Sequence, residues 1–350
     1  MKLPDDEKEP DKFSPIILAV IFVIAIVILV LWINKDSLVR KNNGDYGMSS
    51  PSNFEESSTY VPPSTLSPDD FDFWEKYPAI TPNPTMEPTP EPQKDPSTDG
   101  KHTKIMNEEG EEEWIEINPN LERHSYDFSG LIKQSEMMKY YHTDRLSSYL
   151  GVDISKYQGY VDFIKVKKAG VDFCILRVGA RGYGTGQLLL DSYFQENIKR
   201  ASDAGLEIGV YFFSQAITVE EAVEEANMVL EQIAGYEVKY PVVFDMEYIE
   251  NGTARVEQLD VNQKTEIARA FLDTVESKGY TPMLYGKKEW LLTRVDLEKL
   301  ERYDIWLSQY EDVPDYPYQF TMWQYTDMGK VDGISGKVDM NISFIDYSEK

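Results

Sequence analysis

The chain has 350 residues, of which 41% are hydrophobic, and it carries a formal net charge of −26 at pH 7. This length allows one large domain or two small ones. The strong negative charge argues against nucleic acid and anionic lipid headgroups as partners. Cys174 is the single cysteine, which excludes a disulfide within the chain, and its apolar neighbours in the sequence predict a small buried side chain.

Residues 16–33 form an unbroken apolar run, IILAVIFVIAIVILVLWI. A stretch of about 18 apolar residues is long enough to cross a bilayer. We therefore predict a transmembrane helix at 16–33 that follows a short tail at 1–15. A cleaved signal peptide is the alternative, but the leader is acidic and no small-residue cleavage site follows the run. Basic residues are equally frequent on the two sides of the run, so charge does not set its orientation.

Residues 34–111 are rich in Pro, Ser, Thr and acidic residues and have no periodic apolar face. Such a composition predicts a disordered and extended stalk. Residues 112–150 contain a short alternating segment at 114–117 and a pattern typical of a hairpin at 138–150. We predict that 112–150 form an N-terminal extension packed on the main domain.

From residue 151 onward, apolar runs that predict strands alternate with helical patterns. The clearest helical patterns lie at 191–204, 219–234 and 261–278, where acidic residues near the start suit a helix N-terminus. The predicted strands are 151–155, 173–178, 207–214, 241–248, 281–286, 304–310, 320–326 and 338–344.

Five successive strand–helix units predict a parallel sheet with helices outside it. The later connections contain prolines or several glycines and no helical pattern, so the final strands are expected to pair partly antiparallel. We predict an α/β fold in which residues 151–350 form an incomplete TIM-like (β/α)5β3 barrel. An open doubly wound sheet is the alternative, but no glycine-rich phosphate loop follows any strand.

The most informative segment is the fourth predicted strand, which ends in Asp245-Met246-Glu247. Side chains alternate along a strand, so the two carboxylates share a face, at the strand end where barrels of this type have their site. The same alternation turns Asp153 and Asp339 inward. A cap or loop hydrogen bond explains one such acid, but four crowded carboxylates are costly and point to function.

Four further side chains are expected at the same mouth of the barrel. Aromatic rings there can stack on sugars, although some belong simply to the core. The three histidines, His102, His124 and His142, all precede the barrel. This excludes zinc hydrolases and histidine-dependent Ser or Cys hydrolases, whereas a carboxylate site for magnesium or calcium stays open. The expected substrate-binding residues are Tyr211, Trp306, Tyr310 and Gln324.

Six segments in order resemble the lysozymes of glycoside hydrolase family 25. They are GVDISKYQG at 151–159, GVYFF at 209–213, FDME at 244–247, IWL at 305–307, MWQY at 322–325 and VDMN at 338–341. The resemblance covers about 151–347. One departure is Phe212, where many members carry histidine, but this side chain is expected to point away from the site.

The resemblance implies an N-acetylmuramidase that cleaves the β-1,4 bond between N-acetylmuramic acid and N-acetylglucosamine in peptidoglycan, with no cofactor and no metal. Glu247 is then the general acid, and Asp245 stays ionised and stabilises the developing positive charge. Asp153 and Asp339 complete the catalytic set. A retaining reaction through the substrate's acetamido group and an inverting reaction through water held by Asp153 or Asp339 both remain open.

The implied partners are peptidoglycan glycan strands and, through residues 16–33, the cytoplasmic membrane. Because polymerised peptidoglycan lies outside the cell, we expect a single-pass cell-membrane protein with its N-terminus inside and its barrel facing the wall. Two other functions are weighed against this one. A barrel that only binds peptidoglycan would be expected to lack one of the acids, and a chitinase-like barrel would need a longer Asp-rich strand motif.

Overall fold

The computed structural model describes residues 95–107, 110–248 and 254–349. The predicted tail, the predicted transmembrane segment at 16–33 and most of the predicted stalk lie outside these ranges. Among the described residues, no helix is long and apolar enough to cross a membrane.

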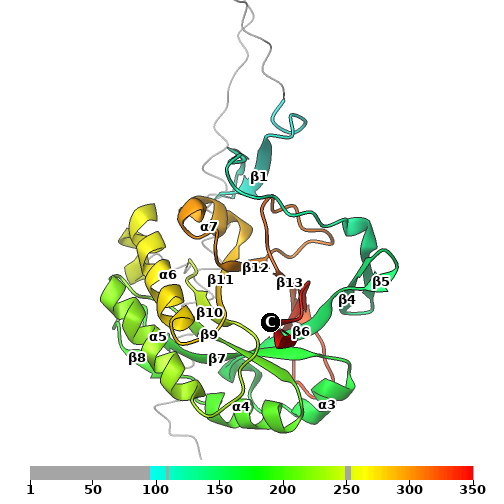
Figure 1. Ribbon diagram of the computed structural model, residues 1–350, viewed down its shortest axis with the longest axis vertical. Helices are drawn as coiled ribbons and strands as arrows, with labels where there is room; N and C mark the ends of the chain where they lie inside the picture. The colour runs from blue at the N-terminus through cyan, green and yellow to red at the C-terminus, as the bar shows by residue number, and fades with distance from the viewer. Residues whose placement is uncertain (1–94, 108–109, 249–253, 350) are drawn as a thin grey trace, which may run out of the picture. The chain divides into compact units, whose positions relative to one another are not determined.

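Eight strands close into a barrel, because β6 pairs with both β7 and β14 (Figure 1). Neighbouring strands are parallel from β6 round to β13, and β14 is antiparallel to both of its neighbours. The closed barrel and its antiparallel end confirm the predicted fold and exclude the open sheet. The barrel strands are β6 (Tyr149–Ile154), β7 (Phe173–Arg181), β9 (Glu207–Phe213), β10 (Val242–Asp245), β11 (Pro282–Lys287), β12 (Asp304–Ser308), β13 (Met322–Gly329) and β14 (Val338–Ser343).

A helix follows each of the first five barrel strands and lies outside the barrel (Figure 1). Side-chain caps mark the start of two of these helices: Thr218 caps α5, and Asp260 forms a capping box with Gln263 at α6. The apolar faces of the helices pack on the outer side of the strands and form the larger core. The helices are α3 (Phe163–Lys168), α4 (Phe194–Asp203), α5 (Val219–Ile233), α6 (Val261–Glu276) and α7 (Lys288–Thr293).

A second core fills the inside of the barrel below the site. It includes Ile175, Met283 and Met322, which lie on three different strands. The rings of Phe173 and Tyr240 stack at 4.4 Å. Gly151 makes room for this stack, since a Cβ there would lie 2.1 Å from the Phe173 ring. Side chains thus fill the barrel interior, as in other barrels of this size.

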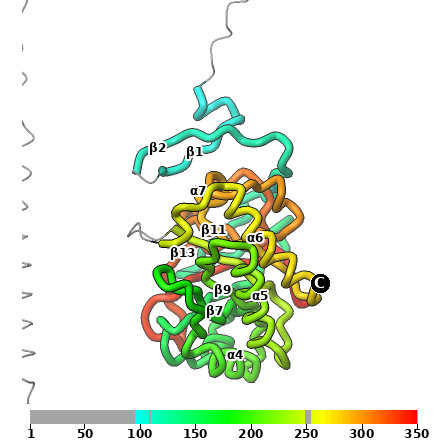
Figure 2. Tube along the Cα trace, turned by 90° about the vertical axis from the view of Figure 1, so that its left-hand side faces the viewer, coloured from blue at the N-terminus to red at the C-terminus, as the bar shows by residue number. Residues whose placement is uncertain are grey.

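An N-terminal extension precedes the barrel. It contains an antiparallel hairpin, β1 (His102–Met106) with β2 (Glu112–Glu116), and a small sheet of β3 (Leu131–Gln134), β4 (Met137–His142) and β5 (Arg145–Leu146). Figures 1 and 2 both place the hairpin beyond α7. The extension thus begins before the predicted boundary at residue 112. The five-residue strand β1 buries only Thr103 and Ile105, so its apolar pattern was too short to recognise.

The extension packs on the barrel through hydrogen bonds and aromatic rings. The Tyr318 hydroxyl accepts from the Asn118 backbone N–H at 2.7 Å, and the Tyr126 hydroxyl donates to the Phe320 carbonyl at 2.7 Å. The rings of Tyr126 and Phe344 stack at 4.2 Å. These contacts join the extension to Phe344, which follows β14, and to the segment before β13.

Two strands differ from the sequence prediction near the site. The fourth strand ends at Asp245, so Glu247 lies just beyond it and not within it. A short strand that the sequence did not predict, β8 (Leu188–Leu190), pairs antiparallel with Gly179–Arg181 at the end of β7. It extends the wall of the barrel beyond the end of β6.

Candidate active site

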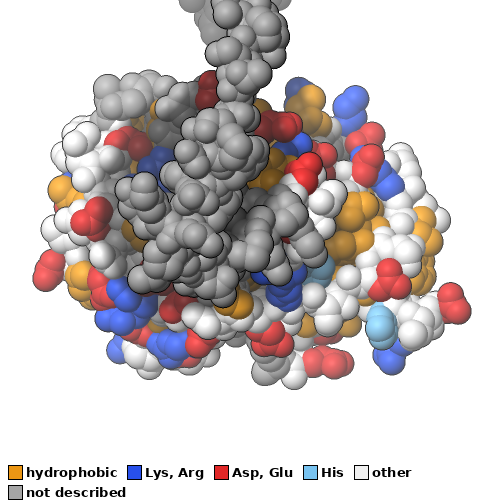
Figure 3. Space-filling view, turned by 90° about the horizontal axis from the view of Figure 1, so that it is seen from above, with side chains coloured by type: hydrophobic (Ala, Val, Ile, Leu, Met, Phe, Trp, Pro, Cys, Tyr) orange, Lys and Arg blue, Asp and Glu red, His pale blue; other side chains and the backbone are white. Residues whose placement is uncertain are grey.

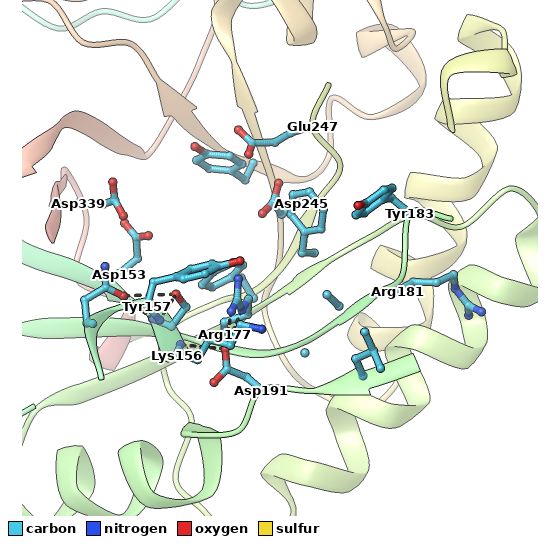
Figure 4. Close-up of a pocket in the computed structure, with 18 of the residues that line it drawn as sticks. Asp153, Lys156, Tyr157, Arg177, Arg181, Tyr183, Asp191, Asp245, Glu247 and Asp339 are labelled. Carbon is cyan, nitrogen blue, oxygen red and sulfur yellow. Dashed lines mark hydrogen bonds and ion pairs between the residues drawn. The ribbon is translucent and has the colours of Figure 1, made fainter. Parts of the chain in front are cut away.

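A cavity of about 850 Å³ opens at the carboxyl ends of the parallel barrel strands and at the amino end of β14. Its lining comes from β6, β7, β9, β10, β11, β12, β13 and β14 and from the loops that follow them (Figure 4). All eight side chains that the sequence singled out line this one cavity. They are Asp153, Tyr211, Asp245, Glu247, Trp306, Tyr310, Gln324 and Asp339.

Asp153 and Asp339 form a pair of carboxyl groups in the cavity. They are opposite each other on β6 and β14, and a hydrogen bond joins their side chains. Burial first, and then the charge of Asp339, raises the pKa of Asp153 well above its usual range. Burial also raises the pKa of Asp339, to about 6. Because a hydrogen bond between two carboxyl groups needs a proton, one proton lies between Asp153 and Asp339.

Two amide side chains hold Asp153 in place. Its Oδ2 accepts from Gln324 Nε2 at 3.0 Å and from Asn341 Nδ2 at 2.9 Å. The Oε1 of Gln324 in turn accepts from three hydroxyl groups, and Trp306 Nε1 donates to Asn341 Oδ1 at 2.9 Å. The three hydroxyl donors are those of Tyr285, Ser308 and Tyr310.

These bonds indicate that two of the predicted substrate-binding residues, Gln324 and Trp306, support the site and do not contact substrate through a free group. Gln324 is 3% exposed and its amide is engaged by protein groups at both ends. Trp306 is 2% exposed, so it forms the floor of the cavity and does not offer an open ring face. Tyr310, by contrast, is 45% exposed at the rim. Tyr211 lies at the barrel wall, where burial and then Asp153 raise the pKa of its hydroxyl well above the usual range.

Asp245 lies at the end of β10, between β9 and β11. Its side chain is buried, and Oδ1 has no hydrogen-bond partner among the described residues. Burial, then Glu247 and Asp153, raise the pKa of Asp245 well above its usual range. A buried carboxyl oxygen without a donor is costly, and it lines a cavity that a ligand can enter.

Glu247 follows the strand and is partly exposed. Burial and the charge of Asp339 raise its pKa, whereas Lys287 opposes this rise. The sequence predicted an ionised Asp245 beside a protonated Glu247. In the free protein, burial instead raises the pKa of both groups. Asp245 is the more deeply buried of the two, so it too favours the protonated form.

Sequence reasoning missed the basic side chains of the cavity. Arg177, Lys156 and Lys287 line it together with the acids. Arg177 Nε and Nη2 contact Asp191 Oδ2 at 2.8 and 2.7 Å. The signal for Arg177 was present, since it is the single charged residue of the predicted strand 173–178, in step with the inward-facing Phe173 and Ile175.

Elsewhere on the surface the two signs of charge are mixed. Figure 3 shows acidic and basic side chains interspersed over the described part of one face. Within the described ranges, no group of three or more His, Cys, Asp or Glu side chains is arranged to hold a metal ion.

A family model described as glycosyl hydrolases family 25 matches residues 152–334. Among curated proteins, the uncharacterized protein YegX of Escherichia coli K12 is 27% identical over 195 residues, which cover 55% of this chain and 68% of YegX. The autolytic lysozyme of Clostridium acetobutylicum is 27% identical over 192 residues, which cover 55% of this chain and 54% of that protein. The chain thus spans about half to two thirds of the length of these relatives.

The fold also resembles that of a solved structure, the modular autolysin LytC of Streptococcus pneumoniae in complex with a synthetic peptidoglycan ligand. The TM-score is 0.51 and the identity 23%, and the match covers 69% of this chain and 56% of that chain. At this level of identity the likeness concerns the fold alone.

Proposed function

Because the chain belongs to family 25 of the glycosyl hydrolases, we propose that this glycoside hydrolase is a muramidase of the lysozyme type. Its substrate is peptidoglycan, and the bond that it cleaves is the β-1,4 bond between N-acetylmuramic acid and N-acetylglucosamine. Support comes from the relatives named lysozyme and from four carboxyl groups gathered in one cavity. Paired carboxyl groups in distinct environments are the usual means of cleaving a glycosidic bond.

The observation that carries this proposal is the unpartnered Oδ1 of Asp245 beside Glu247. The N–H of a sugar's 2-acetamido group is a donor that would satisfy this oxygen. Such a bond favours the ionised form of Asp245 and lowers its pKa. The proton of the pair then resides on Glu247, the group that must donate it.

The chemical roles follow from this assignment. Glu247 protonates the glycosidic oxygen as the bond to C1 breaks. Asp245 holds the acetamido group so that its carbonyl oxygen attacks C1 from the opposite side, and water later opens the cyclic intermediate. The pair of Asp153 and Asp339 lies nearby and raises the pKa of its neighbours, Asp153 acting on Asp245 and Asp339 on Glu247.

The identity of the new chain ends tests the proposal. Purified peptidoglycan is incubated with the chain, the new reducing ends are reduced with borohydride, and the products are identified by mass spectrometry. A muramidase yields reduced N-acetylmuramic acid. Reduced N-acetylglucosamine would assign the other glycosidic bond, and no new ends would leave a barrel that binds without cleaving.

We also propose that residues 16–33 anchor the protein in the cytoplasmic membrane, with the barrel outside. The substrate sets this orientation, because polymerised peptidoglycan lies outside the membrane. A Pro-rich spacer after residue 33 could reach on the order of 100–200 Å into the wall. Protease added to intact, wall-stripped cells should release an active fragment. Release only after the membrane is permeabilised would reverse the orientation and remove the enzyme from its substrate.

A further inference from the structure

One end of the cavity is basic although the chain is strongly acidic. Lys156 and Arg177 line this end, below the four carboxyl groups (Figure 4). Lys156 belongs to the short 3-10 helix Lys156–Gln158 that follows β6, and Arg177 lies on β7. The two strands are adjacent in the barrel, which brings the two cations together.

Asp191 fixes this basic end from behind. Its Oδ2 accepts from Arg177 and from the backbone N–H of Lys156, and its Oδ1 accepts from the backbone N–H of Tyr193. The carboxylate thus holds Arg177 and the backbone of the 3-10 helix in one arrangement. Arg177 Nη1 has no hydrogen-bond partner among the described residues and belongs to a side chain that lines the cavity.

Tyr157 packs beside both cations. Its ring centroid lies 5.0 Å from the Arg177 guanidinium and 5.5 Å from Lys156 Nζ. The ring is 78% exposed, so it forms a wall that a sugar can contact. Among the described residues, the charge of Lys156 Nζ meets the Tyr157 ring and no carboxylate. With Asp191 paired to Arg177, the charge of Lys156 has no carboxylate partner at this end of the cavity among the described residues.

We propose that Lys156 and Arg177, with the ring of Tyr157, form a subsite for a carboxylate carried by a substituent of the bound glycan. The proposal rests on the proposed function and names the feature of the substrate that this site selects. A guanidinium and an ammonium on one side of a cavity match a carboxylate by charge-assisted hydrogen bonds. Peptidoglycan carries such a group on muramic acid, and a neutral polymer of N-acetylglucosamine does not.

The carboxylate has two sources in peptidoglycan. It is the lactyl carboxylate itself in strands that have lost their peptides, and it is a carboxylate of the peptide stem where the lactyl group is amide-linked. Three substrates separate these sources: strands without peptide and with free lactyl carboxylates, the same strands with those carboxyl groups converted to primary amides, and strands that retain their peptide stems.

The decisive variant is Lys156→Met, which removes the uncompensated charge without leaving a buried partner behind. On strands with free carboxylates we expect KM to rise about tenfold, the usual size of one charge-assisted contact, with kcat within about twofold. Lys156→Arg should restore most of the lost affinity. Lys168→Met is the matched control, because it removes one exposed charge from α3 outside the cavity.

The amide-capped strands separate recognition of the carboxylate from any general effect. The affinity of the wild-type protein for capped strands should be about as low as the affinity of Lys156→Met for free strands. Lys156→Met should bind capped strands no more weakly than the wild-type protein does. If Lys156→Met loses affinity only for peptide-bearing strands, the subsite binds the carboxylate of the stem. If it loses affinity only for free strands, the subsite binds the lactyl carboxylate. An equal KM for free and capped strands with the wild-type protein, together with an unchanged KM of Lys156→Met for peptide-bearing strands, would overturn the proposal.

Calorimetric binding distinguishes failure of the subsite from failure of the proposed function. A Glu247→Gln protein is titrated with free and capped strands, and then with Lys156→Met added. If Glu247→Gln binds free strands more tightly than capped strands and the added Lys156→Met removes this difference, the result supports the subsite. This holds even if the wild-type protein cleaves nothing. Cleavage by the wild-type protein without any such preference retains the muramidase and rejects the subsite.

Discussion

Asp153 and Asp339 are directly opposite each other on the antiparallel strands β6 and β14, and their carboxyl groups share a hydrogen bond. Like charges in directly opposed positions destabilise a sheet. The proton in their hydrogen bond removes one of the two charges, and Gln324 and Asn341 both donate to Asp153. Such an arrangement serves no structural need, which is the physical reason for regarding it as part of the active site.

Glu247→Gln should abolish cleavage and leave folding intact. The amide has the same shape but cannot donate a proton to the glycosidic oxygen, so we expect a loss of kcat of about 100-fold or more. Steady-state assays on peptidoglycan and thermal unfolding measure the two effects. Glu237→Gln is the control, since that carboxylate is 78% exposed. Near-normal turnover by a folded Glu247→Gln protein would remove Glu247 from the role of general acid.

Asp245→Asn should impair kcat severely and move the alkaline limb of the pH–rate profile to lower pH. In the substrate complex, where Asp245 is ionised, its charge opposes ionisation of Glu247, and a neutral Asn in its place lets the pKa of Glu247 fall. The profile of kcat between about pH 4 and 9 tests this coupling. If the residual activity keeps the wild-type alkaline limb, the two carboxyl groups do not titrate together.

Gln324→Leu should lower kcat by about tenfold to 100-fold, because Asp153 loses a buried donor and three hydroxyl groups lose their acceptor. Tyr310→Phe removes only one of those hydroxyl donors and should cost less than about threefold. Both variants are compared by kcat and KM on the same glycan. A rise in KM with unchanged kcat for Gln324→Leu would indicate that Gln324 binds the substrate directly, as the sequence predicted.

The stability of the fold should depend on pH through Glu225, which is fully buried and contacts Arg181 at 2.8 Å and Ser214 at 2.6 Å. Burial raises the pKa of Glu225 to about 7 from an ordinary 4.5. The folded state therefore binds the proton more tightly than the unfolded state. The stabilisation of the folded state that comes from this bound proton is fully present at pH below about 4.5 and is lost as pH rises towards 7.

Glu225→Gln, which mimics the protonated form, should thus gain stability relative to the wild-type protein as pH rises, by up to about 3 kcal/mol between pH 4.5 and 8. Urea unfolding at several pH values measures this difference. Glu224→Gln, which removes an exposed partner of the same arginine, should change stability little. A constant difference between Glu225→Gln and the wild-type protein across this range would contradict the assignment.

The position of β1 predicts where the barrel can be truncated. Lys288 is 2% exposed, and its Nζ donates to the Lys104 carbonyl at 2.7 Å and to Asp315. A fragment of residues 112–350 loses the first of these acceptors, so it should be less stable than 95–350 by about 1–3 kcal/mol. Thermal unfolding of the two fragments decides this, and equal midpoints would show that the hairpin adds nothing to the barrel.

The barrel could be predicted from the sequence because its strands are apolar, evenly spaced and alternate with helices. The inward acids could be predicted because Val152 and Ile154 must face the helices, which leaves Asp153 to face the interior. The partners of Asp153 could not, since Gln324 and Asn341 reach it from strands that are distant in sequence and meet only when the barrel closes.

The same limit applies to charge. The burial of Asp245 and Glu247, which raises the pKa of both, depends on where β10 ends, and the sequence did not show that the strand stops at Asp245. The pair of Arg177 and Asp191 depends on the return of the chain through β8, a strand of three residues with no distinct pattern. Tertiary pairing decides both features.

The most direct test of the central claim is digestion of purified peptidoglycan in water labelled with oxygen-18, with the wild-type protein and Glu247→Gln side by side. Hydrolysis of the proposed bond places the label on C1 of N-acetylmuramic acid, at the new reducing end, in the wild-type digest only. Label on C1 of N-acetylglucosamine, or equal labelling by Glu247→Gln, would contradict the proposed assignment of the bond and of its general acid.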